Sequence, residues 1–313
     1  MEKEFNTTTF TYKLIPDEFL QDGKIKEDLK FNFTNPKFKI QNSKFLSNCD
    51  NFETMLFLPE GEDRKGEGGL RTKGYFKFSY KKVDDKWFIC DFYGNIMKEA
   101  PEDIQKKIKE YAKSLNKDQN INELPLITVI TVVLNGAKTL EETIQSVINQ
   151  TYPNVEYIII DGGSTDGTLD IIKKYENYID YWISERDKGI YDGMNKGVEI
   201  ANGKWINFMN AGDIFSTKKV LKESLKIFTI NDIAIIYSDM IVKFGDYGVL
   251  KRAYNISKIN YFMPFQHQCS FTKSSIIKEC KFDTNFKLAS DYNLFLLQYQ
   301  KGGKFYYLNR PIA

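Results

Sequence analysis

Ile127–Leu134 reads Ile-Thr-Val-Ile-Thr-Val-Val-Leu, and this stretch decides the fold. It is a nearly unbroken run of apolar and β-branched residues, which is typical of a strand buried on both faces of a parallel sheet. The run ends at Asn135 and Gly136. Thr139 and, three residues later, Glu142 have the pattern of a capping box, which predicts that a helix begins directly after the strand.

The same order of strand and polar segment occurs twice more. Val155–Ile160 is a second apolar run and leads directly into the polar segment Asp161–Thr168. Trp205–Met209 is a third strand candidate and ends in Asn210–Asp213. Strands that alternate with helices at this spacing predict right-handed βαβ units and a parallel sheet. Because ligands bind at the carboxyl ends of such strands, we expect the polar segments to meet in one site.

Four motifs near these predicted strand ends carry a family resemblance. In chain order they are Val132–Gly136, Asp161–Thr168, Asp187–Gly197 and Asn210–Asp213, followed later by Ser290 and Asp291. As an ordered set they resemble the family 2 glycosyltransferases, most of all the bacterial branch that builds surface polysaccharides and lipooligosaccharides. The resemblance covers about Leu124 to the C-terminus. It implies an α/β domain of the GT-A type, with a mostly parallel sheet flanked by helices.

The residues before this core differ from it in character. Phe5–Leu14 and Phe31–Ile40 alternate aromatic and β-branched residues with polar ones, which predicts half-exposed strands. We therefore expect residues 1–100 to form a small β-rich domain, whose role the sequence does not reveal. Residues 101–123 are predicted to form a helix and a linker, and residues 124–313 the GT-A domain.

Several further elements are predicted from local patterns. Ser216 is expected to cap a helix that runs to Phe228, and Ser290 to begin a last helix that runs to Tyr299. His267–Thr272 is a strand candidate. Gly68–Tyr75 resembles a segment that precedes the core in relatives, and it has two interpretations, a plain turn and a loop that cradles phosphate.

Composition excludes some classes of protein and sets the expected location. With 313 residues and 42% apolar residues, the chain can bury a substantial core, and its length predicts about two domains. A net charge of +2 gives no electrostatic footprint for nucleic acid, so we expect no nucleic-acid partner. The four cysteines lack C-x-x-C spacing, which favours thiols in a reducing cytoplasm. We see no signal peptide and no run of about 18 apolar residues, so we expect a cytoplasmic protein with at most peripheral contact at the inner face of the cytoplasmic membrane.

Sugar transfer from a nucleotide donor creates negative charge on the leaving diphosphate, which a divalent cation can stabilise. Mn²⁺ or Mg²⁺ is usually held by one or two carboxylates together with the substrate phosphates. The resemblance assigns Asp213 to the metal, although Asn210–Asp213 supplies one carboxylate where the family commonly has two in a D-x-D motif. His267, the only histidine, stands where relatives have a histidine near the diphosphate. Its imidazole is a candidate metal or phosphate ligand, and a satisfied core histidine is the alternative.

The resemblance also assigns three residues after the first two strands to the nucleotide. Asn135 is expected to lie along the base or ribose. Asp161 is expected to accept hydrogen bonds from the nucleobase, which favours uracil because its N3–H is a donor. Ser164 is expected to contact the donor or to cap the following helix.

Three later residues complete the expected donor site. Asp187 should line the donor pocket. Lys188 beside it is either a phosphate contact or part of a surface salt bridge. Asn210 is assigned to the ribose or the donor sugar.

An acceptor hydroxyl must lose its proton as it attacks, which calls for a carboxylate or imidazole beside it. The resemblance places this general base at Asp291, at the start of the last helix. An aspartate there would also stabilise a helix by meeting its dipole, so a structural role is the alternative. Asp239, at the end of its predicted strand, is expected to contact the acceptor or to support the metal site.

These assignments predict an inverting, metal-dependent glycosyltransferase. The expected reaction moves a hexose or N-acetylhexosamine from a UDP-sugar to a hydroxyl of a growing bacterial surface glycan, which could be lipid-linked. The sequence has neither the order of a dinucleotide fingerprint nor that of a P-loop. The alternative function is a non-catalytic sugar- or nucleotide-binding module, a decayed transferase, which the single carboxylate at Asp213 suggests.

Overall fold

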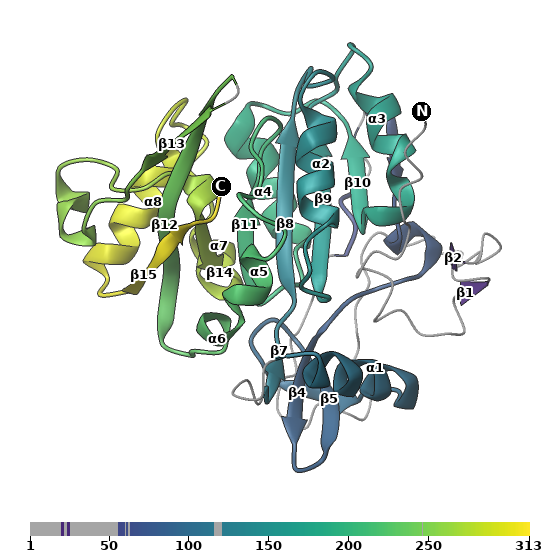
Figure 1. Cartoon of the computed structure of the whole chain (residues 1–313). Helices are drawn as coiled ribbons and strands as arrows, with labels where there is room; N and C mark the ends of the chain where they lie inside the picture. Colours follow the sequence, from purple (N-terminus) through teal and green to yellow (C-terminus); the bar gives the residue numbers. More distant parts are fainter. Residues whose placement is uncertain are drawn as a thin grey trace.

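The computed structural model describes residues 56–59, 61, 63–115, 121–245 and 247–313, together with the short strands β1 (Leu20–Gln21) and β2 (Lys24–Ile25) (Figure 1). β1 and β2 pair with each other in an antiparallel arrangement. The strands predicted for Phe5–Leu14 and Phe31–Ile40 lie outside the described residues.

A mixed sheet of nine strands forms the centre of the molecule. In spatial order its strands are β13 (Tyr247–Lys251), β12 (Ile233–Phe244), β14 (Ser270–Lys273), β11 (Trp205–Phe208), β8 (Ile127–Val133), β9 (Val155–Asp161), β10 (Tyr181–Ser184) and β3 (Gly66–Gly68), and β15 (Lys304–Pro311) pairs with β12. The four central strands β11, β8, β9 and β10 are parallel, whereas β14 lies antiparallel to both β11 and β12. The predicted α/β fold, with a parallel sheet core flanked by helices, is confirmed.

Helices cover both faces of this sheet (Figure 1). They are α2 (Leu140–Ile148), α3 (Thr168–Lys174), α4 (Ile190–Ile200), α5 (Val220–Glu223), α6 (Leu225–Phe228), α7 (Ser274–Cys280) and α8 (Ser290–Gln300). Single 3₁₀ turns add η3 (Arg71–Lys73), η4 (Glu176–Tyr178), η5 (Ile256–Asn260) and η6 (His267–Cys269).

Residues of β8 alternate between two hydrophobic layers, as the buried-strand pattern predicted. Val129 and Val133 pack in the layer that contains α2, α3, α5 and α6. Ile130 and Val132 pack in the opposite layer, which contains α4, α7 and α8. All seven residues of β8 are buried. Since a fully buried Val or Ile stabilises a fold by about 1.5–3 kcal/mol, this strand holds the two layers together.

A second, four-stranded sheet lies at the end of the molecule where β8 begins (Figure 1). It consists, in spatial order, of β6 (Ile96–Glu99), β5 (Lys86–Cys90), β4 (Ser79–Val83) and β7 (Glu123–Leu124), and α1 (Glu102–Lys113) packs with it. The predicted helix after residue 101 is confirmed. The domain boundary near residue 124 remains a proposal, and β3, which precedes it in the chain, pairs with β10 in the large sheet.

Two local predictions about helix starts need correction. Thr139 occupies the N-cap position of α2, but its side chain makes no capping hydrogen bond. The prediction of one helix over Ser216–Phe228 is wrong in two respects. Helical structure begins only at Val220, and it consists of two short helices, α5 and α6. The Ser216 hydroxyl instead donates to the carbonyl oxygen of Pro311 at 2.7 Å, which ties this segment to the end of β15.

The strand predicted for His267–Thr272 is also wrong at its start. Residues 267–269 form the 3₁₀ turn η6, and β14 begins only at Ser270. The turn is closed by the Cys269 N–H, which donates to the Gln266 carbonyl at 3.0 Å, and by the Ser270 hydroxyl, which donates to the His267 carbonyl at 2.7 Å. His267 therefore lies on a turn at the entrance to the strand.

A buried ion pair fixes the amino-terminal edge of the large sheet. Arg71 and Glu156 are each 1% exposed and lie 2.5 Å apart. The guanidinium also donates to the carbonyl oxygens of Leu56 and Ile200, both at 2.9 Å. The second carboxylate oxygen of Glu156 accepts from the Thr128 hydroxyl at 2.6 Å. Gly68–Tyr75 thus contains a turn that anchors the chain to the core, which agrees with the turn interpretation.

Replacing Glu156 by Gln should destabilise the protein by about 3–5 kcal/mol, because Arg71 would remain buried as an uncompensated charge. Urea denaturation of the two proteins measures the difference. The matched control is Glu223→Gln, which removes the exposed partner of Arg310 and should cost at most about 1 kcal/mol. Equal losses in the two variants would contradict the importance of the buried pair.

Lys278 on α7 lies near the same ion pair. Its ammonium donates to the carbonyl oxygen of Glu199 at 3.0 Å. Burial, aided by the charge of Arg71, lowers the pKa of Lys278 from 10.5 to about 8, against the opposing charges of Glu156 and Glu199. The folded chain therefore binds this proton less tightly than the unfolded chain does.

The stability of the protein should consequently rise with pH relative to that of Lys278→Met. Above pH 8 the folded chain releases the proton, while the unfolded chain keeps it up to about pH 10.5, so the unfolded state binds more protons. From pH 7 to pH 10 the unfolding free energy of the natural chain should therefore rise by on the order of 2 kcal/mol relative to that of Lys278→Met. Urea titrations across that range measure it, and a constant difference would contradict the lowered pKa.

Candidate active site

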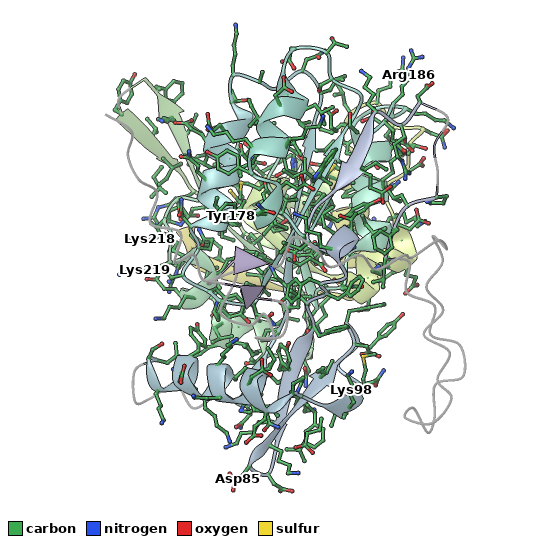
Figure 2. All side chains as sticks on the ribbon, turned by 90° about the vertical axis from the view of Figure 1, so that its right-hand side faces the viewer. Asp85, Lys98, Tyr178, Arg186, Lys218 and Lys219 are labelled. Atoms are coloured by element: carbon green, nitrogen blue, oxygen red, sulfur yellow. The ribbon has the colours of Figure 1, made fainter. Side chains whose placement is uncertain are left out.

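The predicted site residues follow the carboxyl ends of the parallel strands. Arg186, two residues after β10, lies at the opposite end of the molecule from Asp85, which is in the turn between β4 and β5 (Figure 2). The candidate site and the small sheet thus lie at opposite ends of the parallel strands.

The first two loops of the site are joined to each other by hydrogen bonds. Asn135 has the left-handed backbone conformation, with φ +53°, which Asn adopts more readily than most residues. Its N–H donates to the Ser164 hydroxyl at 2.7 Å, and its side-chain oxygen accepts from the Thr165 N–H at 2.9 Å. Asp166 accepts from the N–H of Ala137 at 3.0 Å and from the first N–H of α3 at 3.1 Å. The Asn135 backbone and the Ser164 side chain are therefore brought together, and Asp166 caps α3.

Asp161 ends β9 and is fully buried. Its carboxylate accepts hydrogen bonds from the Ser164 N–H at 3.1 Å, from the Ser164 hydroxyl, and from the Ser184 hydroxyl at 2.5 Å. Ser184 is the last residue of β10. In this structure Asp161 thus connects the ends of β9 and β10 and orders the loop that follows.

Asp187 lies against two glycines and is half-buried. A Cβ atom at Gly162 would stand 2.6 Å from its Oδ2 atom, and one at Gly193 would stand 3.2 Å from it. Burial raises the pKa of Asp187, although the Gly189 N–H donates to its Oδ1 at 3.0 Å. The neighbouring Lys188 side chain is exposed. The motif glycines therefore make room for the Asp187 carboxylate.

Asp213 follows β11 in a turn that its N–H closes on the Asn210 carbonyl at 2.9 Å. Burial raises the pKa of Asp213, against the influence of His267 and of a hydrogen bond from Gln268. That bond runs from the Gln268 side-chain amide to Oδ1 of Asp213 over 3.2 Å. The amide oxygen of Gln268 is buried and has no hydrogen-bond partner within the described part of the chain.

A chain of hydrogen bonds joins this turn to the start of α8. His267 Nδ1 lies 3.2 Å from Oδ2 of Asp291, and His267 Nε2 lies 3.1 Å from Nδ2 of Asn210. Because the Asn210 amide nitrogen is a donor, Nε2 accepts and the proton of the neutral ring is assigned to Nδ1, which donates to Asp291. The Tyr191 hydroxyl donates to the other carboxylate oxygen, Oδ1, at 3.1 Å.

These two donors decide the protonation of Asp291. Burial would raise its pKa, but the hydrogen bond from His267 opposes burial, aided by the Tyr292 N–H and the Tyr191 hydroxyl, and the pKa stays below its ordinary value. Asp291 is therefore ionised at neutral pH. A carboxylate that is ionised, oriented from two sides and partly buried can act as a general base.

In this structure the side chains of His267 and Asp239, expected near the metal and the acceptor, are bound to other residues of the chain. A metal contact through His267 would require Nε2 to leave Asn210. Asp239 is 3% exposed, and its Oδ1 accepts from the Tyr307 hydroxyl at 2.7 Å and from the Ala253 N–H at 2.9 Å. In this structure Asp239 thus connects β15 to the segment after β13.

Asp213 and Gln268 together fit a hard cation. The Gln268 amide nitrogen contacts the Asp213 carboxylate, and the amide oxygen on the same group is unpartnered; carboxylate and amide oxygens are both ligand types that Mg²⁺ and Mn²⁺ accept. No group of three or more His, Cys, Asp or Glu side chains that could hold a metal ion occurs in the ranges that the structure describes. A cation bound here would therefore take most of its ligands from a substrate and from water.

Sequence reasoning did not assign Gln268 or Ser184 to the site. Gln268 is adjacent in sequence to Cys269 and lies in the stretch that was predicted as a strand, where alternate residues point to opposite faces. The turn η6 changes these directions and brings Gln268 to Asp213. Ser184 looked like an ordinary strand residue, and its contact with Asp161 depends on the pairing of β10 with β9.

Comparison with known proteins identifies the family. The family model "Glycosyl transferase family 2" matches residues 128–285, half of the chain. The chain belongs to glycosyl transferase family 2. The matched region contains the motifs after β8, β9, β10 and β11, so the resemblance that these motifs carried is confirmed.

Relatives of this family 2 chain include proteins named for bacterial glycan biosynthesis. It is 38% identical over 106 residues to TuaG of Bacillus subtilis, named a teichuronic acid biosynthesis glycosyltransferase, which covers 33% of this chain and 42% of the relative. It is 29% identical over 156 residues to a PGL/p-HBAD biosynthesis glycosyltransferase of Mycobacterium bovis, which covers 49% of this chain and 60% of the relative. An uncharacterised glycosyltransferase of Mycobacterium tuberculosis is 29% identical over 186 residues, covering 55% of this chain and 68% of the relative.

Solved structures share the fold of this family 2 chain. TarS from S. aureus, crystallised with UDP, superposes with a TM-score of 0.50 at 19% identity, covering 60% of this chain and 61% of TarS residues 1–349. The longer TarS structure gives a TM-score of 0.51, covering 60% of this chain and 36% of TarS. In the described residues, no helix is both long and apolar enough to cross a membrane.

The hydrogen-bond chain predicts one ring tautomer for His267. Because His267 is the only histidine in the chain, its nitrogen signals can be assigned without ambiguity. Long-range ¹H–¹⁵N NMR should show that the neutral form of the ring carries its proton on Nδ1. In Asn210→Asp the partner of Nε2 becomes an acceptor, and Nε2 should become protonated. A ring protonated on Nε2 in the natural chain would contradict the arrangement.

Proposed function

We propose that this protein transfers a hexose or N-acetylhexosamine from a UDP-sugar to a hydroxyl of a growing bacterial surface glycan, with inversion at the anomeric carbon. The observation that carries the proposal is the hydrogen-bond chain from Asn210 through His267 to Asp291. It connects an ionised carboxylate to the turn that contains Asp213. The family membership, the names of the relatives and the binding of UDP by TarS support the same reaction.

Asp291 is the proposed general base. It takes the proton of the acceptor hydroxyl as the acceptor oxygen bonds to the anomeric carbon. At the same time the bond from that carbon to the diphosphate oxygen breaks, and UDP leaves from the opposite face. His267 and Tyr191 are positioning residues in this step, because their hydrogen bonds hold the two oxygens of the carboxylate.

Asp213 is the proposed ligand of Mn²⁺ or Mg²⁺, and the Gln268 side chain, whose amide nitrogen contacts it, carries an unpartnered oxygen that could join the metal by rotation of the amide. A divalent cation bound there would offset the negative charge that develops on the diphosphate. Without a cation, burial makes the ionised form of Asp213 costly, as its raised pKa indicates. Binding the cation would remove part of that cost.

The nucleotide would lie over the loops after β8, β9 and β10. Asn135 and Ser164 are joined there by a hydrogen bond, and Asp161 orders the same loop by accepting from the Ser164 N–H. In the proposal Asn135 and Ser164 contact the uridine, and the buried Asp161 holds Ser164 for that contact. Asp187 and Asn210 line the donor sugar or ribose, and Lys188 contacts phosphate. The acceptor would be lipid-linked or a lipooligosaccharide core, and the protein would act in the cytoplasm at the inner face of the membrane.

Two matched Asp→Asn variants should separate donor binding from catalysis. UDP with Mn²⁺ should raise the melting temperature of the natural chain and of Asp291→Asn, while Asp213→Asn should lose the part of the shift that depends on the metal. With UDP-sugar and acceptor, Asp291→Asn should lose 10²–10⁴-fold in kcat, the usual range for removal of a general base. Differential scanning fluorimetry and a UDP-release assay measure the two effects. Unchanged turnover in Asp291→Asn would refute the assignment of the base, and UDP binding with no transfer by the natural chain would favour the non-catalytic binding module.

A further inference from the structure

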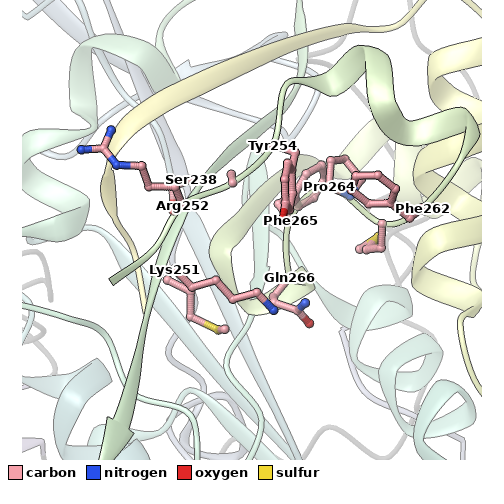
Figure 3. Close-up of a pocket in the computed structure, with 11 residues that line it drawn as sticks. Ser238, Lys251, Arg252, Tyr254, Phe262, Pro264, Phe265 and Gln266 are labelled. Atoms are coloured by element: carbon pink, nitrogen blue, oxygen red, sulfur yellow. The ribbon is translucent and has the colours of Figure 1, made fainter. Parts of the chain in front are cut away.

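A cavity of about 380 Å³ lies beside the candidate catalytic residues, between the β12–β13 hairpin and the segment that follows it (Figure 3). It is lined by Ser238, Met240, Lys251, Arg252, Ala253, Tyr254, Phe262, Met263, Pro264, Phe265 and Gln266. None of these residues was assigned to the site, and the volume is in the range of small-molecule pockets.

The cavity is connected to the site by direct contacts. Gln266, which lines it, immediately precedes His267. Met240, which also lines it, receives a contact from the Gln268 amide, whose nitrogen lies 3.7 Å from the methionine sulfur. The same amide donates to Asp213. Only His267 therefore separates the candidate base Asp291 from the cavity wall, and only Gln268 separates Asp213 from it.

The order of the strands separates this cavity from the proposed nucleotide site. Asn135, Ser164 and Asp187 follow β8, β9 and β10, whereas the cavity is built on β12 and β13. β14 and β11 lie between the two groups in the sheet. A ligand in the cavity would therefore approach Asp291 from the side away from the nucleotide, which is where an attacking hydroxyl must be in an inverting reaction.

The walls of the cavity suit a sugar ring. Phe265 is 3% exposed and is stacked on Tyr237, with ring centroids 4.8 Å apart. Tyr254 and Phe262 meet edge to face at 5.0 Å. Phe265 is therefore covered by other rings, whereas Tyr254, 57% exposed, and Phe262, 41% exposed, have ring surface against which the apolar face of a sugar can pack.

The charged residues that line the cavity, Lys251 and Arg252, are both cationic. They are consecutive, so their side chains leave the strand in different directions. The Lys251 ammonium points towards Gln266, while the Arg252 guanidinium points away from the centre of the cavity (Figure 3). The charge of Arg252 acts instead on Tyr307, whose hydroxyl donates to Asp239. Lys251 is the cation that an occupant of the cavity would meet.

Resting on the proposed function, we propose that this cavity binds the acceptor and selects a sugar that carries an anionic group. Lys251 pairs with the anion, and the aromatic walls hold the ring so that a neighbouring hydroxyl reaches Asp291. The anion is a carboxylate or a phosphate, and both meet an ammonium in the same way. A carboxylate would come from a hexuronic acid, and a phosphate from a sugar phosphate or a phosphate-linked carrier.

The test uses the full chain saturated with UDP and Mn²⁺ and three matched forms of glucose and of galactose: the neutral methyl glycoside, the methyl glycoside of the uronic acid, and the 6-phosphate. Saturation-transfer NMR titrations give the affinities. At least one anionic form should bind about fivefold more tightly than its neutral counterpart, the gain expected for one ion pair in a partly exposed pocket. The tighter form identifies the anion as carboxylate or phosphate.

Lys251→Gln should remove this preference, and Arg252→Gln, the adjacent control, should keep it. Both variants should show the same melting shift with UDP as the natural chain. Equal binding of neutral and anionic forms, no binding of any form by a protein that binds UDP, or equal losses in the two variants would overturn the inference. Failure of UDP itself to bind would instead overturn the proposed function, and the sugar titrations repeated without nucleotide would still test the cavity.

Discussion

The imidazole of His267 connects two parts of the chain that lie far apart in sequence. One ring nitrogen contacts Asn210 at the end of β11, and the other contacts Asp291 at the start of α8. The position of the ring is set by η6, where the Ser270 hydroxyl binds the His267 carbonyl as β14 begins. Since β14 pairs with β11, the sheet fixes the position of His267 relative to the turn that carries Asp213, and the hydrogen bond from His267 then connects Asp291 to that turn.

The loops of the site lie at the carboxyl edge of the large sheet, and the opposite, amino-terminal edge is held by a buried ion pair. Arg71 and Glu156 are buried at the amino-terminal edge of the strands, and both layers of the core pack against β8 between the two edges. Each loop at the carboxyl edge is then held by a few hydrogen bonds to the next, as between Asn135 and Ser164. An ion pair of this kind adds little net stability compared with apolar residues, so we ascribe to it the position of the turn η3 after β3 rather than the stability of the core.

Much of the fold could be predicted because its signals are local. β8 and β9 are apolar runs bounded by turn residues, and both begin at the predicted residue. The failures have a common physical cause. Ser216 binds Pro311, 95 positions away, and the Ser270 hydroxyl closes the turn at His267 where a strand was predicted, contacts that the local pattern does not contain. For the site, the family resemblance pointed to Asp213 and Asp291, whereas the contact of Gln268 with Asp213 arises from the turn η6, which the alternating pattern concealed.

Asp291 and Asp213 both lie near His267, but their pKa values are shifted in opposite directions. Asp291 receives hydrogen bonds from His267 and Tyr191, and its pKa falls. Asp213 receives one bond, from Gln268, and burial raises its pKa. Fixed donors keep the Asp291 carboxylate ionised and oriented toward its task, and because they also lower its basicity, the proton of the acceptor hydroxyl must transfer late in the attack. A carboxylate whose charge is poorly compensated gains most from an added cation. The difference in their partners therefore supports the division of labour that we propose, with Asp291 as base and Asp213 as metal ligand.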